Sequence, residues 1–217
     1  LFRVMPDVSG IPGRIINVNG KDAVNFSGNN YLGLAGHPDL IRAASEYAHK
    51  YGAGSTASRL IAGNSDPHRE LESFIAQWKG TESALLFVSG YQANVGAVSG
   101  VAGKEDLIIS DQLNHASIID GCRLSRAKVE VYPHLDLNRL EDLLRQRGFR
   151  RKLVVTESVF SMDGHQAPLK EIFALCREWG AVLMVDEAHG TGLFGPQGQG
   201  LAAEQGVVPD IQMGTLG

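Results

Sequence analysis

The sequence predicts an α/β fold, with a mostly parallel sheet between two layers of helices. Three observations lead to this prediction. Short apolar runs alternate along the chain with amphipathic segments that have the period of a helix. The apolar runs are nearly continuous, as expected for strands that are covered on both faces of a parallel sheet. The 26 glycines form no repeat but separate these segments, which indicates tight turns between strands and helices.

Each expected strand is a short run rich in Val, Ile and Leu. The runs KLVVT at 152–156 and AVLMV at 181–185 are the clearest examples. The run SALLFV at 83–88 has the same character. The complete set of expected strands is 83–88, 107–110, 128–132, 152–156, 181–185 and 211–213.

The expected helices have favourable residues at their ends as well as an apolar stripe. Asp66 and Pro67 are favoured at a helix start, and Gly80 follows the last apolar residue of that segment. Pro38 and Gly52 bound another helix in the same way. Further helices are expected at 91–102, 137–147 and 169–179, and a small hairpin or arm at 8–22.

Composition and charge exclude several classes of protein. The 20 basic and 24 acidic residues give a net charge of −4, so we expect no broad basic surface and no nucleic-acid partner. The sequence contains no apolar run of about 18 residues and no signal-peptide pattern, so no membrane association is expected. Cys122 and Cys176 are too few for a disulfide framework. Free thiols of this kind predict a cytoplasmic protein.

The residues that directly follow the expected strands are the candidates for a site, because ligands of α/β sheets bind beyond the strand ends. Asp186 and His189 follow the strand at 181–185, where the carboxylate caps the next turn or faces a cationic ligand atom. Gly90 and Tyr91 begin a helix whose free N–H groups suit a phosphate. His115 is either a hydrogen-bonded structural residue or a ring that stacks on a flat ligand.

Several common sites are not expected. The glycines at 195–200 lack the spacing of the dinucleotide fingerprint, and no P-loop motif occurs, which disfavours a nucleotide-binding oxidoreductase. No G-x-S-x-G motif of a serine hydrolase is present. The histidines and cysteines lack the spacings of a zinc site, so we expect no metal.

Taken together, a series of short segments resembles the α-oxoamine synthases, pyridoxal-phosphate enzymes with the type I aminotransferase fold. The segments follow the family's order along nearly the whole chain. They are NFSGNNYLGL at 25–34, GAGSTASRLIAG at 52–63, SGYQAN at 89–94, NHASIIDG at 114–121, TESVFSMDG at 156–164, VDEAHGTG at 185–192 and GTLG at 214–217.

The resemblance implies pyridoxal phosphate (PLP) as the cofactor, and a role for each matching residue. Asp186 would face the ring nitrogen, His189 would bond the phenolic oxygen, and His115 would stack on the ring; these three are the expected catalytic residues. The other residues that match cofactor contacts are Gly90, Tyr91, Ser161 and Thr215, of which Thr215 would bind the phosphate.

The family's reaction is a decarboxylative condensation of an amino acid with an acyl-CoA or an acyl carrier protein. By the resemblance, Asn29 would lie near the amino acid's carboxylate and Arg3 near the acyl-CoA tail. The segments favour a member that joins alanine to a pimeloyl thioester in biotin biosynthesis. Members that join glycine to acetyl-CoA, or that transfer a palmitoyl group to serine, remain alternatives. A homodimer is expected, as is typical of the family.

In this family a lysine that binds the cofactor covalently directly follows the segment matched by 214–217. The resemblance therefore predicts that lysine at position 218, just beyond the sequence, and a C-terminal small domain after it. We expect an N-terminal arm at 1–36 and an incomplete cofactor-binding large domain at 37–217. A non-catalytic partner subunit that lacks the lysine is the alternative. The lysines within the sequence are expected to be surface charges.

Overall fold

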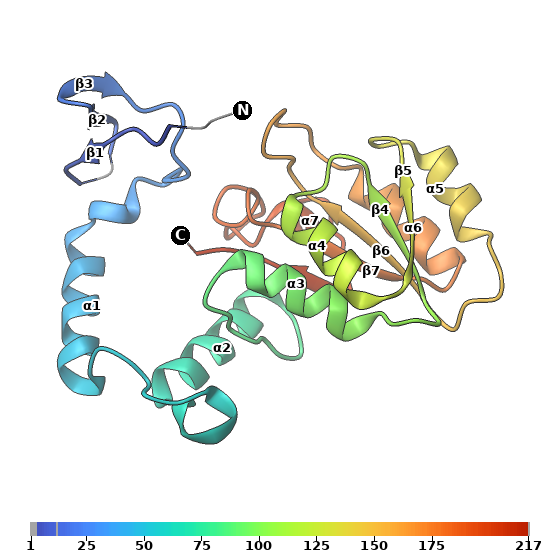
Figure 1. The fold of residues 1–217 in the computed structure, drawn as a ribbon, viewed down its shortest axis with the longest axis horizontal. Helices are drawn as coiled ribbons and strands as arrows, with labels where there is room; N and C mark the ends of the chain where they lie inside the picture. Colours follow the sequence, from blue (N-terminus) through green and yellow to red (C-terminus); the bar gives the residue numbers. More distant parts are fainter. Residues whose placement is uncertain (1–3, 12, 217) are drawn as a thin grey trace. The chain divides into compact units, whose positions relative to one another are not determined.

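The computed structural model describes residues 4–11 and 13–216, and the chain forms two compact units. One unit extends to Phe74 and the other runs from Ile75 to Leu216 (Figure 1). Helix α2 (Asp66–Lys79) contains the point of division. The predicted domain boundary at residue 36 concerns a different division and stays a prediction.

The first unit begins with a small antiparallel sheet. Strands β1 (Val8–Ser9), β2 (Ile15–Val18) and β3 (Lys21–Val24) pair in sequence order. Asn19 and Gly20 join β2 to β3, and both have positive φ angles, 49° and 80°. This is the backbone that a two-residue hairpin turn requires, and Asn-Gly is its preferred sequence. The hairpin expected in this region is therefore present.

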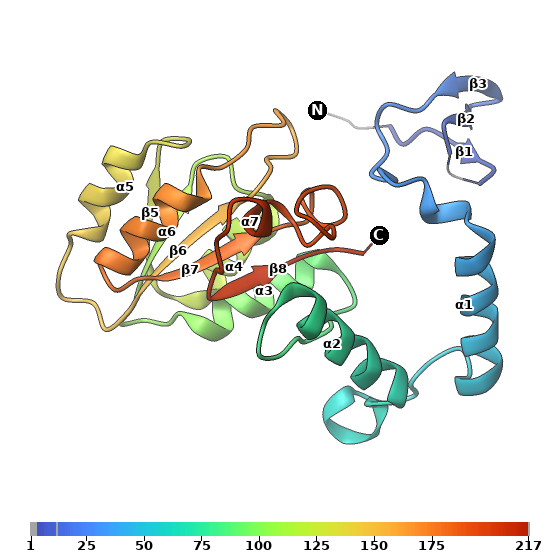
Figure 2. The same ribbon diagram turned by 180° about the vertical axis from the view of Figure 1, so that it is seen from behind.

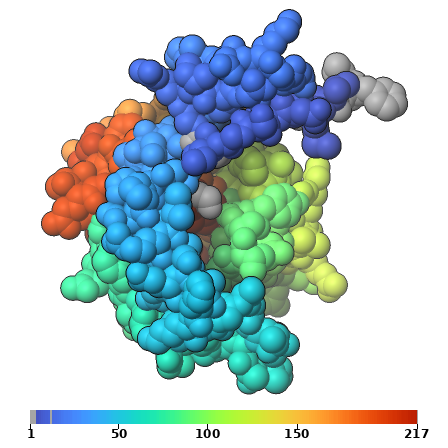
Figure 3. Space-filling view, turned by 90° about the vertical axis from the view of Figure 1, so that its left-hand side faces the viewer, coloured from blue at the N-terminus to red at the C-terminus, as the bar shows by residue number. Residues whose placement is uncertain are grey.

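The first unit continues with the 3₁₀ helix η1 (Leu34–Gly36), helix α1 (Pro38–Tyr51) and a single π-helical turn, η2 (Arg59–Gly63). Helices α1 and α2 have the predicted bounds. His37 caps α1 by accepting a hydrogen bond from the main-chain N–H of Asp39. The side chains of α1 are exposed along almost its whole length, and the helix is the light-blue segment of the space-filling view (Figure 3).

The second unit is built on a five-stranded sheet in the order β5-β4-β6-β7-β8, with every pair parallel. This confirms the predicted fold class. The strands are β4 (Leu107–Asp111), β5 (Lys128–Tyr132), β6 (Lys152–Glu157), β7 (Val182–Asp186) and β8 (Ile211–Met213). Figure 2 shows β8 at one edge of this sheet.

Helices cover both faces of the sheet, as Figures 1 and 2 show. Ile108, on one face of β4, packs in a cluster with residues of α3 (Gly90–Val101) and α4 (Ala116–Ser125). Its neighbours Leu107 and Ile109 belong to the opposite cluster. That cluster includes residues of α5 (Leu137–Leu144), α6 (Leu169–Glu178) and α7 (Leu201–Glu204). Alternate residues of one strand thus support two separate cores, and this explains the continuous apolar runs.

The strand predicted at 83–88 is wrong. Within the described residues this segment forms no ladder, and Leu85, Phe87 and Val88 are exposed, Val88 by 88%. An apolar run becomes a strand only where a neighbouring strand satisfies its main-chain groups. The other five predicted strands are present, with ends that differ by at most one residue. The helix predicted at 137–147 ends at Leu144.

Two further observations concern the whole chain. Cys122 and Cys176 are free and buried, and burial raises the pKa of their thiols to about 11 and about 12. Both thiols are therefore protonated and unreactive at neutral pH. In the part of the chain that the structure describes, no helix is at once long enough and apolar enough to cross a bilayer.

Candidate active site

Three carboxylates lie at the carboxyl ends of neighbouring strands. Asp111 ends β4, Glu157 ends β6 and Asp186 ends β7, and all three are buried. Glu157 and Asp186 are paired residues in the register of the sheet. Because parallel strands end at the same edge, the topology gathers acidic groups where ligands of such sheets bind.

The Asp186 carboxylate is held by two neutral donors. The side-chain amide of Asn94 donates to Oδ2 at 2.7 Å, and the main-chain N–H of Ala188 donates to Oδ1 at 2.8 Å. Burial raises the pKa of Asp186, while these hydrogen bonds and the nearby imidazoles of His115 and His189 act in the opposite direction. A buried carboxylate with neutral bonding partners favours a cation in front of it.

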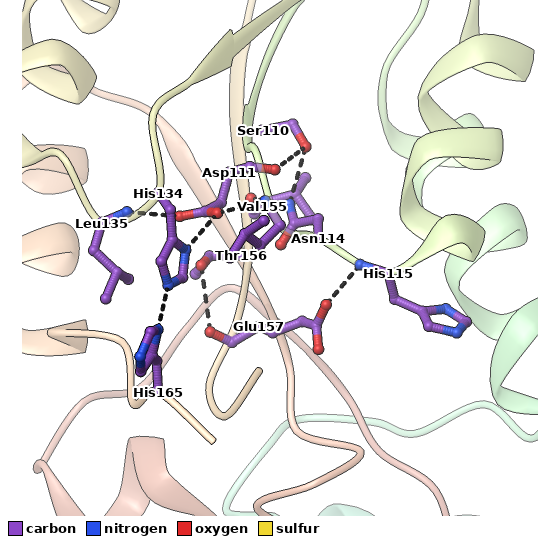
Figure 4. A network of polar contacts seen from close by, with 11 residues as sticks. Ser110, Asp111, Asn114, His115, His134, Leu135, Val155, Thr156, Glu157 and His165 are labelled. Atoms are coloured by element: carbon purple, nitrogen blue, oxygen red, sulfur yellow. Dashed lines mark hydrogen bonds and ion pairs between the residues drawn. The ribbon is translucent and has the colours of Figure 1, made fainter. Parts of the chain in front are cut away.

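His115 is the N-cap residue of α4, and its imidazole is at the surface of the unit. Its Nδ1 atom lies 2.7 Å from the hydroxyl of Ser117 and accepts from the main-chain N–H of Ser117 at 3.2 Å. Figure 4 shows the ring directed away from Glu157, whose carboxylate accepts instead from the His115 main-chain N–H at 2.6 Å. One face of the imidazole is thus available to a flat group.

Glu157 has an unusual protonation equilibrium. Burial is the largest effect and the charge of Asp186 the next, and together they raise the pKa of Glu157 to about 7. Hydrogen bonds from the main chain of His115 and of Ser161 act against this rise. The site therefore contains one carboxyl group that changes its charge near neutral pH.

The third carboxylate, Asp111, belongs to a network that joins the loops after three strands (Figure 4). It accepts from the main-chain N–H groups of Leu113 at 2.8 Å and Leu135 at 3.0 Å. His134 lies 2.9 Å from Asp111 through Nδ1 and 3.0 Å from His165 through Nε2. Among the described residues no cluster of acidic, His or Cys side chains is arranged to hold a metal ion. The network therefore acts as a structural link between loops.

The N-terminus of α3 lies close to the end of the chain. Ser89 caps this helix by accepting from the main-chain N–H of Gln92 at 3.2 Å. A Cβ atom at Gly90 would lie only 2.6 Å from the side chain of Thr215, so glycine is required for this approach. The Tyr91 hydroxyl bonds to Asp120 of α4. The first N–H groups of α3 thus point to the place where Thr215 also lies.

The loop after β7 is folded around Glu187, which is fully buried. Its carboxylate accepts from the Ser158 hydroxyl at 2.8 Å, from the N–H of Leu201 at 3.1 Å and from the N–H of Ala202 at 2.7 Å. A Cβ atom at Gly190 would lie 2.0 Å from this carboxylate, which explains the glycine there. Glu187 therefore fixes the loop that carries His189.

Lys79 holds the same loop from outside, and its expected place as a surface charge is wrong. Its ammonium group donates to the Thr191 hydroxyl at 2.9 Å and to the carbonyl oxygen of Gln199. Burial lowers the pKa of Lys79, and the charge of Glu187 acts against this change. A half-buried lysine thus secures both ends of the loop.

We expect Glu187→Gln to lower the free energy of unfolding by about 2 kcal/mol, because glutamine offers one acceptor oxygen where glutamate offers two. At least one N–H group at the start of α7 would then be buried without a partner. Urea denaturation followed by circular dichroism measures the change. Glu178→Gln, at the exposed end of α6, is the control and should leave the midpoint unchanged. Equal midpoints for both variants would contradict the role of Glu187.

The remaining predicted site residues lie in different places. His189 is half-buried in the loop after β7, and Ser161 is exposed after β6 with its main chain bonded to Glu157. Asn29 is exposed in the first unit, where it accepts from the Tyr31 hydroxyl at 3.4 Å. Arg3 lies outside the described residues.

Several residues of this site were not singled out from the sequence. Asn94 and Ser117 contact the predicted residues directly, and Glu157, Glu187 and Lys79 surround them. Asn94 and Ser117 lie four residues after Gly90 and two after His115, within the segments that carry the resemblance. Polar residues one helical turn from a candidate site are the signal that would have identified Asn94.

The residues present fit pyridoxal phosphate. The Asp186 carboxylate is buried with neutral donors, so a protonated ring nitrogen would supply the cation it favours. The N-terminus of α3, a helix of 12 residues, and the Thr215 hydroxyl offer donors to a phosphate. The exposed imidazole of His115 offers a flat face to the ring.

Comparison with known proteins agrees with this geometry. The family model of aminotransferase class I and II matches residues 21–217. An 8-amino-7-oxononanoate synthase of Geobacter sulfurreducens is 52% identical over the whole chain, which covers 56% of that protein. The chain therefore spans little more than half the length of this relative.

Two solved structures are also similar. A serine palmitoyltransferase from S. paucimobilis with bound PLP and myriocin has a TM-score of 0.93 and 37% identity, over 97% of this chain and 54% of that one. An 8-amino-7-oxononanoate synthase from Francisella tularensis has a TM-score of 0.72 and 32% identity, over 84% of this chain and 50% of that one. Family and neighbours indicate pyridoxal phosphate as the cofactor. The match over residues 21–217 shows that this chain belongs to the class I and II aminotransferase family.

Proposed function

We propose that this chain is the greater part of the cofactor-binding region of an α-oxoamine synthase that works in biotin synthesis. The proposed reaction joins alanine, with loss of its carboxyl group as CO₂, to a pimeloyl thioester of CoA or of an acyl carrier protein. The observation that carries the proposal is the buried Asp186 carboxylate beside His115 at the end of a parallel sheet. The name of the relative with 52% identity supports the choice of substrates.

Pyridoxal phosphate, when bound, supplies an electron sink for the carbanion at the α-carbon of the amino acid. Asp186 keeps a proton on the ring nitrogen that faces it, because the buried carboxylate is stabilised by that positive charge. Asn94 and Ala188 hold both carboxylate oxygens, so the charge needs no rearrangement during the reaction. The imidazole of His115 covers one face of the ring and excludes water.

The other predicted residues have proposed roles in binding. His189 bonds the phenolic oxygen, Ser161 adds a polar contact, and Thr215 binds the phosphate together with the main chain at Gly90 and Tyr91. Asn29 lies near the amino acid's carboxylate, and Arg3 near the acyl-CoA tail.

We propose further that the protein is a homodimer in the cytoplasm. The exposed side chains of Tyr31 and Leu32 in the first unit support an interface with a second copy, because apolar side chains of this size favour burial.

Two other reactions of the same class are the alternatives. The likeness to serine palmitoyltransferase, with a TM-score of 0.93, favours transfer of a palmitoyl group to serine. Condensation of glycine with acetyl-CoA uses the same binding groups. A non-catalytic partner subunit requires a residue other than lysine directly after Gly217.

The test uses protein expressed from the complete gene. With PLP it should become yellow, and borohydride should remove the colour if a lysine holds the cofactor. Release of CoA should be fastest with alanine and pimeloyl-CoA. Glycine with acetyl-CoA, and serine with palmitoyl-CoA, are the competing pairs. Release of CoA from one of those pairs alone would replace the proposed substrates, and a colourless protein that ignores PLP would overturn the proposal.

A further inference from the structure

A continuous chain of hydrogen bonds joins the Asp186 carboxylate to the imidazole of His115. The Asn94 amide nitrogen is 2.7 Å from Asp186 Oδ2 and 2.9 Å from the hydroxyl oxygen of Ser117. That hydroxyl is 2.7 Å from His115 Nδ1. Asn94 is 1% exposed and Ser117 is fully buried, so water does not compete for these bonds.

The direction of each hydrogen bond follows from the charge at one end. An ionised carboxylate only accepts, so the NH₂ group of Asn94, and not its oxygen, must face Asp186. The second hydrogen of that NH₂ group points to the Ser117 oxygen. Ser117 Oγ therefore accepts from Asn94 and uses its own hydrogen to donate to His115 Nδ1. The main-chain N–H of Ser117 donates to the same Nδ1 at 3.2 Å.

The unpaired oxygen of Asn94 supports this orientation. Asn94 Oδ1 is buried and has no hydrogen-bond partner among the described residues. Buried polar atoms are normally paired, so an orientation that leaves one unpaired must be held by its other bonds. Turning the amide over would place Oδ1 against the Asp186 carboxylate, which repels it.

We propose that Asn94 and Ser117 are positioning residues that hold the imidazole of His115 with its proton on Nε2 and its Nδ1 turned to the protein. Two donors at Nδ1 leave no room for a proton there. The proton on Nε2 then lies on the side of the ring away from Ser117. The value of this arrangement for catalysis rests on the proposed function, because it presents His115 as a neutral flat ring in a fixed direction.

The charged groups around the imidazole act on it from separate elements. Asp186 at the end of β7 reaches His115 through Asn94, and Glu157 at the end of β6 is bonded to the main chain of His115. His189, in the loop after β7, also acts on Asp186. None of these groups replaces the two donors at Nδ1, so the chain through Asn94 and Ser117 determines the tautomer.

The test is nuclear magnetic resonance of the full chain with ¹⁵N-labelled histidine, without PLP, at about pH 8.5, some two units above the ordinary histidine pKa. The signals of His115 should show a single tautomer with the proton on Nε2. Ser117→Ala should produce a mixture with the Nδ1-protonated form. Ser117→Cys, which keeps the size of the side chain, should do the same because a thiol is a weak donor.

Ser125→Ala is the matched control. Ser125 is a buried serine on the same helix, and its hydroxyl bonds to the carbonyl oxygen of Cys122. The control should leave the His115 tautomer unchanged even where it lowers stability. An unchanged tautomer in both Ser117 variants would overturn the inference.

A second measurement links the chain to the cofactor. Asn94→Leu removes the donor to a charged group, so PLP should bind about tenfold more weakly to protein from the complete gene. Ser125→Ala should retain the affinity of the wild type. If the tautomer changes as expected but the wild type binds no PLP, the proposed function fails while the positioning role stands.

Discussion

Replacement of Asp186 by asparagine should lower the turnover number by about 100- to 1,000-fold, the usual effect of removing one fixed group that stabilises developing charge. The neutral amide keeps the shape of the side chain but no longer favours a proton on the group that faces it. Steady-state release of CoA at saturating PLP measures the effect. The same variant should gain stability relative to the wild type as the pH rises.

The sign of that pH dependence follows from the raised pKa of Asp186. The folded wild type holds its proton more tightly than the unfolded chain, so its stability falls as the pH rises from the ordinary aspartate pKa through the raised one. Asparagine cannot ionise and does not show this loss. Denaturation of the PLP-free protein at several pH values measures the difference between the two proteins.

Asp111→Asn is the matched control for Asp186→Asn. Asp111 is also a buried carboxylate at a strand end, but two main-chain N–H groups and His134 surround it. Its replacement should reduce stability and leave turnover close to that of the wild type. Loss of turnover in Asp111→Asn to the same degree, or normal turnover in Asp186→Asn with PLP bound, would contradict the assignment of the essential carboxylate.

The central sheet could be predicted because its strands carry their own signal. Runs such as those of β6 and β7 are apolar on both faces, and each strand supports two cores. The run at 83–88 has the same composition but lacks a neighbouring strand among the described residues. Composition reports the preference of a segment for burial, whereas a strand also requires a partner, and the sequence of one segment does not contain its partner.

The candidate site was predicted in part, for a related reason. Asp186 and His115 follow apolar runs directly, so the rule for ligand sites at strand ends identifies them. Asn94 lies inside a helix, where a polar residue that faces the core cannot be told from one that faces solvent unless the packing is known. Lys79 was expected at the surface because buried lysines are rare. Its partners Thr191 and Gln199 are more than 100 residues away in the sequence.

Glu157→Gln should stabilise the protein above neutral pH by about 3 kcal/mol, which corresponds to the rise of the Glu157 pKa from its ordinary 4.5 to about 7. The raised pKa means that the folded wild type prefers the protonated carboxyl. Its stability therefore falls as the pH rises from about 4.5 to about 7, and the whole loss is present above that range. Glutamine remains neutral, so the two proteins should be equally stable near pH 4 and separate as the pH rises.

The cause of the raised pKa distinguishes this prediction from a general effect of burial. Asp186 supplies like charge from β7 and Asp111 from β4, while the main-chain N–H groups of His115 and Ser161 favour the ionised form. Removing the charge of Asp186 should therefore lower the pKa of Glu157, and Glu157→Gln should stabilise less in an Asp186→Asn background. Denaturation of the four proteins at pH 4, 6 and 8 measures this coupling. Equal effects of Glu157→Gln in both backgrounds would mean that the two carboxylates, although paired in the register, do not share one electrostatic site.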